Sequence, residues 1–207
     1  MSPDPSLLKS MIAAAAVRII GAADELTALD QAIGDGDHGI NMKRGCEQVL
    51  AELDAIAAKP TGEAPKAVGM ALVMKVGGAS GPLYGSGSLF MSMGKKLGER
   101  PATIELLPEV FAAGVEAVAA RGKSTPCEKT MLDVLTPVLE AMRPGEPVRA
   151  ESLRKAAARG AASTIPMRAT KGRASFLGER SIGHMDPGAR SSQIMIEALS
   201  AFLEQRT

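Results

Sequence analysis

Three carboxylates lie within eight residues in the segment LDQAIGDGDHG. Asp30 comes first, and Asp35 and Asp37 flank Gly36. Because glycine has no Cβ and tolerates unusual backbone angles, this segment can curl until the three side chains converge. Converging carboxylates repel one another unless a cation lies among them. The oxygen-only set predicts a hard cation, and Mg²⁺ held by carboxylates and phosphate oxygens is the usual arrangement in phosphoryl transfer.

Other interpretations of this cluster fit less well. An EF-hand calcium loop that began at Asp35 would need Glu at its twelfth position, where the chain has Cys46. Zinc would need more nitrogen or sulfur ligands than His38 supplies. A turn with capping carboxylates is the main competitor, because Asp and Gly are both common turn residues. The residues around the cluster must therefore decide between a turn and a metal site.

His38 and Asn41 follow the carboxylates at the predicted start of the next helix. Free N–H groups at a helix N-terminus attract phosphate, and a neutral imidazole or an amide can donate a further hydrogen bond. A histidine beside a helix cap is often structural, but its position next to three aspartates favours a place for His38 in the site.

Two further glycine-rich segments carry polar side chains. KVGGASGPLYGSGS places Gly77, Gly78 and Ser80 before a predicted helix, where backbone amides can approach phosphate oxygens. It lacks the Gly-Lys-Ser or Gly-Lys-Thr of a Walker loop, and close helix packing is the alternative. KGRASFLGERSIGHMDPGARSS combines arginines with the turn signal Asp-Pro-Gly, so it predicts either a loop that closes over a nucleotide or a solvated turn.

The composition indicates one all-helical domain spanning residues 1–207. Apolar residues make up 45% of the chain but aromatics only 2%, so Ala, Leu, Ile, Val and Met must fill the core. Such residues favour packed helices, and 207 residues suit a single core. Apolar residues recur at helical spacing in eight segments, which run over about 7–20, 42–56, 65–76, 81–97, 105–120, 128–142, 151–169 and 189–204.

We expect the functional residues to lie in the loops between these helices. Asp30 would lie near the end of the first helix, and no alternating run supports the strands of a βαβ nucleotide fold. The glycines concentrate between helices, so the site should lie at one end of the bundle.

Charge and cysteine content exclude several classes of protein. The 24 basic and 23 acidic residues create no overall field for DNA or an anionic membrane, so neither is an expected partner. The chain shows no apolar run of about 20 residues and no signal-peptide order, which predicts a cytoplasmic protein. Cys46 and Cys127 are too few for a disulfide scaffold, so we expect both to be reduced.

Four sequence motifs together resemble the nucleotide-binding L subunit of bacterial dihydroxyacetone kinases: GDGDHGINMKRG, VGGASGPLYG, EKTMLDVL and GRASFLGERSIGHMDPGA. The resemblance runs nearly end to end. It implies an antiparallel eight-helix barrel with the nucleotide bound across one rim. It also implies that Asp30, Asp35 and Asp37 hold two Mg²⁺ ions on the phosphates of ADP or ATP.

The resemblance also implies the remaining site residues. With His38, the three aspartates form the catalytic set that it predicts. Met131 would be an apolar wall beside the adenine. The predicted nucleotide contacts are His38, Gly39, Ile40, Asn41, Ala79, Ser80, Gly122, Met131, Arg173, Asp186, Pro187 and Gly188.

The activity implied is phosphoryl transfer from the bound nucleotide to dihydroxyacetone held on a separate K subunit. Free-standing L subunits resembling this 207-residue chain usually work with an M subunit of the phosphoenolpyruvate phosphotransferase system, which recharges ADP in place. Three alternatives remain open: an ATP-dependent kinase subunit for another short ketose such as erythrulose, a non-catalytic nucleotide-sensing adaptor, and a carrier of apolar ligands. The oligomeric state is also open, a homodimer included.

One departure from the family pattern precedes the KTM segment. Members of the family often have Gly-Asp there, whereas this chain has Cys127-Glu128. The change keeps a carboxylate but loses a glycine, so the loop before Met131 should be less pliant. We expect altered nucleotide exchange before any loss of activity.

Overall fold

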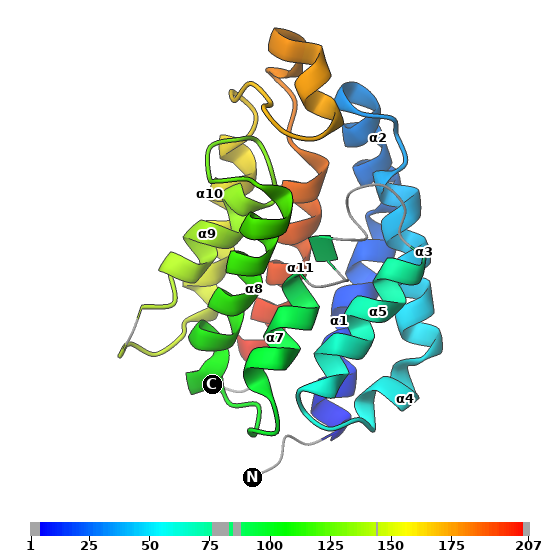
Figure 1. Ribbon diagram of the computed structural model, residues 1–207, viewed down its shortest axis with the longest axis vertical. Coiled ribbons are helices and arrows are strands. Elements are labelled where there is room, and N and C mark those ends of the chain that lie inside the picture. The colour runs from blue at the N-terminus through cyan, green and yellow to red at the C-terminus, as the bar shows by residue number, and fades with distance from the viewer. Residues whose placement is uncertain (1–4, 76–82, 85–87, 144, 205–207) are drawn as a thin grey trace.

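The computed structural model describes residues 5–75, 83–84, 88–143 and 145–204, and within these ranges the chain is helical and forms no strand (Figure 1). The all-helical class predicted from composition and periodicity is therefore confirmed. The α-helices bounded within this part of the chain are α1 (Pro5–Gly21), α2 (Ala23–Ile33), α3 (His38–Ala51), α4 (Leu53–Ala57), α5 (Glu63–Lys75), α7 (Leu89–Leu97), α8 (Leu107–Gly122), α9 (Leu132–Glu140), α10 (Ala150–Ser163) and α11 (Pro187–Glu204). Two 3-10 helices, η1 (Ile104–Leu106) and η2 (Arg173–Ser181), accompany them.

The predicted division into eight helices is not confirmed, because several segments divide differently. Asp30 lies in a separate helix, α2, after the chain turns at Ala22. The expected helix 42–56 is interrupted at Glu52, whose backbone angles are not helical, so it becomes α3 and α4. η2 lies in a segment that the sequence predicted to be a loop.

Two predicted helices begin later than their apolar pattern. Within the range 81–97, residues 83–84 are helical and α7 begins only at Leu89, because Ser88 has φ −115° and ψ −129°, outside the helical region. The one expected over 128–142 begins at Leu132 as α9, because Cys127 and Lys129 have positive φ values. A left-handed backbone cannot continue a right-handed helix, whatever the side-chain pattern suggests.

Consecutive long helices pack side by side around a common interior. α1 contacts α3, α3 contacts α5, α5 contacts α7, and α7 contacts α8. The series continues through α9 and α10 to α11, and α11 returns to pack against α1. η2 lies at the end of the molecule opposite the start of α1 and the finish of α11 (Figure 1).

The side chains inside this arrangement are mostly aliphatic, as the low aromatic content predicts. Ile19, Leu26 and Met42 are fully buried on one side, and Leu132 and Leu135 are buried on the other. They belong to one cluster that extends from α1 to α11. A cavity of about 220 Å³ with apolar walls lies beside this core, between α1, α7 and α11 among others. None of the described helices has the length and apolar character needed to cross a membrane.

Candidate functional site

The turn between α2 and α3 brings the three predicted metal ligands together. Asp30 is buried in the last turn of α2, while Asp35 and Asp37 lie in the turn itself. One carboxylate oxygen from each residue lies within 4.8 Å of the others. Gly36 has φ +76°, a value that suits glycine, so the turn depends on the residue type that the sequence supplies there.

Asp30 also fixes the start of α3. Its Oδ2 accepts hydrogen bonds from the backbone N–H of Asp37 at 2.9 Å and of His38 at 3.1 Å. The carboxylate thus caps α3 from the neighbouring helix and places negative charge at its positive end. The expectation that free amides at this helix start attract phosphate is wrong for these two groups, because Asp30 already accepts their hydrogen bonds.

Two glycines allow this close packing of α2 against α3. A Cβ on Gly34 would lie 2.1 Å from Asp30 Oδ1, so a larger residue would displace the carboxylate. A Cβ on Gly39 would lie 1.9 Å from the Ala23 carbonyl oxygen and 2.3 Å from Thr27 Oγ1. Gly39 therefore lies against the backbone of α2, where no side chain fits.

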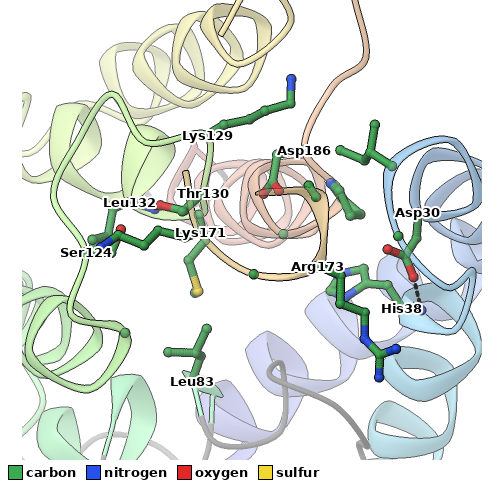
Figure 2. A pocket seen from close by; sticks show the side chains of 18 of the residues that line it. Asp30, His38, Leu83, Ser124, Lys129, Thr130, Leu132, Lys171, Arg173 and Asp186 are labelled. Atoms are coloured by element: carbon green, nitrogen blue, oxygen red, sulfur yellow. Dashed lines mark hydrogen bonds between the residues drawn. The ribbon is translucent and has the colours of Figure 1, made fainter. Parts of the chain in front are cut away.

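A cavity of about 370 Å³ adjoins the carboxylates (Figure 2). Its volume falls within the roughly 300–1,000 Å³ typical of small-molecule sites. Ten of the predicted site residues line it: Asp30, Asp35, Asp37, His38, Gly122, Met131, Arg173, Asp186, Pro187 and Gly188. The cavity joins the α2–α3 turn to the end of α8, the loop before α9 and the start of α11.

The other predicted contacts lie elsewhere. Gly39, Ile40 and Asn41 are not among the residues lining this cavity. Asn41 is buried, and the Ile40 side chain is 49% exposed. Ala79 and Ser80 fall outside the described residues. The structure thus brings ten of the predicted site residues together around one cavity, whereas Gly39, Ile40 and Asn41 in the first turn of α3 do not line it.

His38 connects the carboxylate turn to α11 through buried polar groups. Its Nε2 lies 3.0 Å from Ser191 Oγ, and its ring also hydrogen-bonds the backbone of Pro187. Tyr84 Oη lies 2.9 Å from the hydroxyls of both Ser191 and Ser192. Burial lowers the pKa of His38, although Asp30 and Asp37 act in the opposite direction. Because the ordinary pKa of histidine is about 6.5, a lowered pKa leaves the imidazole neutral at pH 7, with one ring nitrogen as a donor and the other as an acceptor.

Arg173 approaches the carboxylates from η2. Its Nη1 lies 2.9 Å from Asp35 Oδ2, and the side chain is 64% exposed. Figure 2 shows Arg173 on the same side of the cavity as Asp30 and His38. An exposed guanidinium in this position can pair with a carboxylate or with a bound anion, since arginine suits both.

Asp186 lines the cavity directly before the first residue of α11. Its Oδ2 accepts a hydrogen bond from the Ala189 N–H at 2.7 Å, which caps the helix. Burial raises the pKa of this carboxyl to about 7, while the Ala189 N–H and Lys129 oppose the rise. A Cβ on Gly188 would lie 3.0 Å from Asp186 Oδ2 and 3.8 Å from the Met131 side chain, so the turn and Met131 are close neighbours.

Sequence reasoning missed Lys129, which holds the upper wall of the site. The side chain is 1% exposed, and its Nζ donates hydrogen bonds to the carbonyl oxygens of Thr164, at 2.5 Å, and of His184. In Figure 2 the ammonium group points away from the Leu83 side of the cavity. Burial lowers the pKa of Lys129, and Asp186 and Asp133 oppose this effect. No sequence signal marks such a residue, because loop lysines are ordinarily exposed.

Sequence reasoning did not select four further lining residues: Arg121 in the last turn of α8, Ser124 and Thr130 in the loop before α9, and Lys171, whose Nζ lies 3.5 Å from Glu128 of that loop. Asp133 fixes this loop by accepting hydrogen bonds from the N–H groups of Cys127 and Thr130, the latter at 2.7 Å. Cys127 has φ +70°, in the region that favours glycine. Cys127 stands where members of the family often have glycine, so a residue with a Cβ occupies a strained backbone position.

Comparison with known proteins places this chain in a family. The DAK2 domain profile matches residues 32–201, a range that includes Asp35, Asp37 and α11 up to residue 201 and begins two residues after Asp30. The chain belongs to the DAK2 domain family. It is 46% identical, over 86% of its length and 87% of the relative, to the ADP-binding subunit of the PEP-dependent dihydroxyacetone kinase of Escherichia coli K12. Corresponding subunits from Listeria innocua and Lactococcus lactis are 45% and 44% identical, each over 84% of this chain and 84% and 85% of the relative.

A solved structure shares the fold of this DAK2 domain. The dihydroxyacetone kinase of C. freundii, crystallised with AMP-PNP and Mg²⁺, superposes with a TM-score of 0.77 at 24% identity. The superposition covers 97% of this chain and 34% of the kinase chain, so the DAK2 domain spans about a third of that longer protein. At this identity the likeness shows the shared fold.

Proposed function

We propose that this chain is the nucleotide- and magnesium-binding subunit of a phosphoenolpyruvate-dependent dihydroxyacetone kinase. The observation that supports this most is the convergence of Asp30, Asp35 and Asp37 at a nucleotide-sized cavity. The relatives at 44–46% identity are named as ADP-binding subunits of such kinases, and the alignments cover at least 84% of each chain. A turn that served only to cap α3 would need the carboxylate of Asp30 alone, since that group accepts the capping hydrogen bonds and the Asp37 side chain, at the N-cap, accepts none.

The carboxylates suit two Mg²⁺ ions with ADP or ATP. All three ligands are oxygens, the set that this hard cation prefers, and Asp35 and Asp37 face solvent at the mouth of the cavity. Bound there, Mg²⁺ would neutralise charge on the transferring phosphoryl group. We assign Asp30 to hold the turn as well as a metal, and Arg173 to pair with Asp35 or with phosphate. Met131, Leu83 and Val118 form an apolar wall that suits a nucleobase.

His38 is better placed to position the carboxylate turn against α11 than to exchange protons. Its ring is buried and bound to α11, and burial lowers its pKa. We propose that the three aspartates are the catalytic set and that His38 maintains the distance between the metal turn and the start of α11. Gly122, Asp186, Pro187 and Gly188 would complete the nucleotide site around Met131.

The acceptor and the phosphoryl source belong to partner subunits in this proposal. A K subunit would present dihydroxyacetone at the mouth of the cavity, and an M subunit of the phosphotransferase system would recharge ADP in place. The names of the relatives support the phosphoenolpyruvate dependence. We further propose that residues 1–207 form one domain, and that α1, α3, α5 and α7 to α11 form a closed antiparallel barrel, supported by the contact of α11 with α1.

The metal and nucleotide site can be tested by calorimetry. Titration of ADP in the presence of Mg²⁺ should show tight binding to the wild-type chain, and Asp35→Ala and Asp37→Ala should each weaken it by about tenfold or more, since each removes a charged ligand. Asp54→Ala is the matched control, because the Asp54 side chain is 86% exposed and pairs with Lys9 at 2.5 Å, away from the cavity. Unchanged affinity in both cluster variants would refute the metal assignment.

The phosphoryl source is decided by reconstitution. The chain would be combined with K and M subunits and dihydroxyacetone, and product formation followed with either phosphoenolpyruvate or ATP as the donor. Turnover with phosphoenolpyruvate and catalytic ADP supports the proposal. Turnover only with stoichiometric ATP would instead make this an ATP-dependent subunit.

A second acceptor is supported by one group of relatives. The chain is 34% identical to a D-erythrulose kinase of Mycolicibacterium smegmatis, over 86% of this chain and 32% of that protein. A kinase subunit for erythrulose would use the same nucleotide site with a different partner. Comparing dihydroxyacetone and erythrulose in the reconstituted assay distinguishes the two, because the acceptor pocket lies on the partner.

A further inference from the structure

η2 holds an exposed aromatic side chain beside the mouth of the cavity. Phe176 is 89% exposed, whereas Phe111 is 5% exposed and Phe90 and Phe202 are partly buried. A single exposed apolar residue is common on protein surfaces and means little by itself. Here, however, Ile165 and Ile182 on the same segment are also exposed, by 37% and 45%. The Gly183 N–H donates to the Ile165 carbonyl oxygen at 2.8 Å, which brings the two isoleucine positions close together.

The charge of the same segment is also unusual for this chain. Residues 165–184 contain four basic residues and one acidic residue, although the whole chain has a net charge of only +1. Arg173 pairs with Asp35, and Lys171 lies 3.5 Å from Glu128. Arg168 and Arg180 are exposed, and neither takes part in an ion pair recorded among the described residues.

Nucleotide phosphates do not account for these two arginines. Lys171, Arg173 and Ala174 line the cavity, but Arg168, Phe176 and Arg180 do not. Phe176 and Arg180 therefore lie on η2 but outside the nucleotide site, although η2 begins at the wall of that site with Arg173; Arg168 lies in the segment before η2. Aromatic residues and arginine are the types most enriched in protein interfaces and in their energetic centres.

The proposed reaction requires a protein surface at this place. A hydroxyl that attacks a phosphoryl group must come within roughly 3–3.5 Å of it. When the acceptor is held on another protein, that protein must cover the mouth of the cavity to bring the hydroxyl so close. η2 borders the mouth and projects from the end of the molecule (Figure 1), so it would be covered at the same time.

We propose that Phe176, with Arg180 on the same helix and Arg168 in the segment that packs near Gly178 of η2, is the docking point for the protein that carries the phosphoryl acceptor. The ring inserts into an apolar pocket of that partner, and the arginines pair with carboxylates around the pocket. This inference rests on the proposed function, since it takes its partner from it. It adds the surface on which that partner binds and the chemistry that the partner must present.

The kinetic test varies the partner concentration. The probe is the K subunit of the Escherichia coli enzyme, loaded with dihydroxyacetone, and phosphorylation is measured from the Mg–ATP form of this chain. Phe176→Ala should raise the half-saturating K-subunit concentration by about tenfold, as loss of an interface hot spot does. The maximal rate and the affinity for Mg–ADP should not change. Val17→Ala is the control, because Val17 is 57% exposed on α1 and lies outside both cavities.

Substitution of Arg180 tests whether the surface of the partner is acidic. Arg180→Glu should raise the same half-saturating concentration, and added salt should narrow the difference from wild type, because screening weakens attraction between exposed charges. An equal effect of Arg180→Glu and Arg180→Ala at every salt concentration would contradict the acidic partner surface.

A spectroscopic test reports on the ring itself. The chain contains no tryptophan, so Phe176→Trp labelled with 5-fluorotryptophan gives one ¹⁹F resonance. This resonance should move when the unlabelled K subunit is added and stay in place when Mg–ADP is added alone. A response to Mg–ADP alone would make Phe176 a cover for the nucleotide and overturn the docking role.

The remaining outcomes separate this inference from the proposed function. If the wild-type chain neither binds Mg–ADP nor supports transfer, both fail together. If it does both, and Phe176→Ala has the wild-type half-saturating concentration, the docking inference alone is refuted. If Phe176→Ala instead changes the mass of the free chain in light scattering, the surface joins copies of this chain, and the inference is refuted in that way.

Discussion

Replacing Gly39 by alanine separates two roles for this residue. The family resemblance makes Gly39 a nucleotide contact, whereas the structure places it against the backbone of α2. A Cβ at Gly39 would lie 1.9 Å from the Ala23 carbonyl oxygen and 2.6 Å from the Thr27 nitrogen. Both are backbone atoms, so no side-chain rotation relieves the contact. α3 would have to move away from α2 by roughly 1.5 Å to restore van der Waals separation.

That movement sets the size of the effect. Overpacking of this kind costs about 1–3 kcal/mol. Movement of α3 also stretches the two hydrogen bonds from Asp37 and His38 to Asp30, and loss of a helix cap costs about 0.5–2 kcal/mol. Alanine offsets about 0.5–1 kcal/mol of this loss of stability, because it has less backbone freedom than glycine in the unfolded chain. We therefore expect Gly39→Ala to lose about 2–3 kcal/mol of unfolding free energy, or roughly 5–10 °C in Tm.

The assay is urea unfolding, followed by circular dichroism, with Mg–ADP affinity measured in parallel. The matched control is Gly21→Ala, because a Cβ on Gly21 meets nothing within 4 Å. Gly21→Ala should be neutral or slightly stabilising, and its Mg–ADP affinity should equal that of wild type. Gly39→Ala should lose stability and weaken Mg–ADP binding together, since the Asp30 carboxylate moves with the cap. A Gly39→Ala variant as stable as wild type but unable to bind Mg–ADP would refute the packing role.

Two other changes give distinct readouts. Cys127→Gly should raise the unfolding free energy by about 0.5–1 kcal/mol, because Cys127 has φ +70°, where a Cβ is strained; Cys127→Ala should give no such gain, and an equal gain from both would contradict the backbone explanation. The pKa of Asp186 is about 7 in the folded chain, above the roughly 3.9 of an aspartate in the unfolded chain. The folded state therefore favours the protonated carboxyl. This group adds most to the free energy of unfolding below pH ~4, and its contribution is lost as the pH rises to ~7. In EDTA without nucleotide, Asp186→Asn should flatten this part of the stability profile relative to wild type, and a profile of wild-type slope would count against the raised pKa.

Features governed by local sequence were predictable. The helical class follows from apolar residues at helical spacing and from few aromatics, and both are properties of neighbouring residues. The carboxylate cluster was predictable for a similar reason: Asp30 and Asp37 are seven residues apart with Gly34 and Gly36 between them, so little chain has to be ordered to bring them together. Helix boundaries were less predictable, because Cys127 and Lys129 adopt positive φ values that their residue types do not announce.

By itself, then, the sequence determined a helical protein with a carboxylate turn suited to a hard cation, and its family likeness supplied the chemistry. Only the tertiary structure decided which residues meet that turn. His38 pairs with Ser191 across 153 positions, and Lys129 reaches the His184 carbonyl across 55. Arg173 comes to Asp35 from a different part of the chain. Such pairs depend on how each helix is rotated and shifted against its neighbours, and many registers bury the same apolar stripe equally well. The apolar pattern therefore does not specify them, whereas close packing of the whole core selects one.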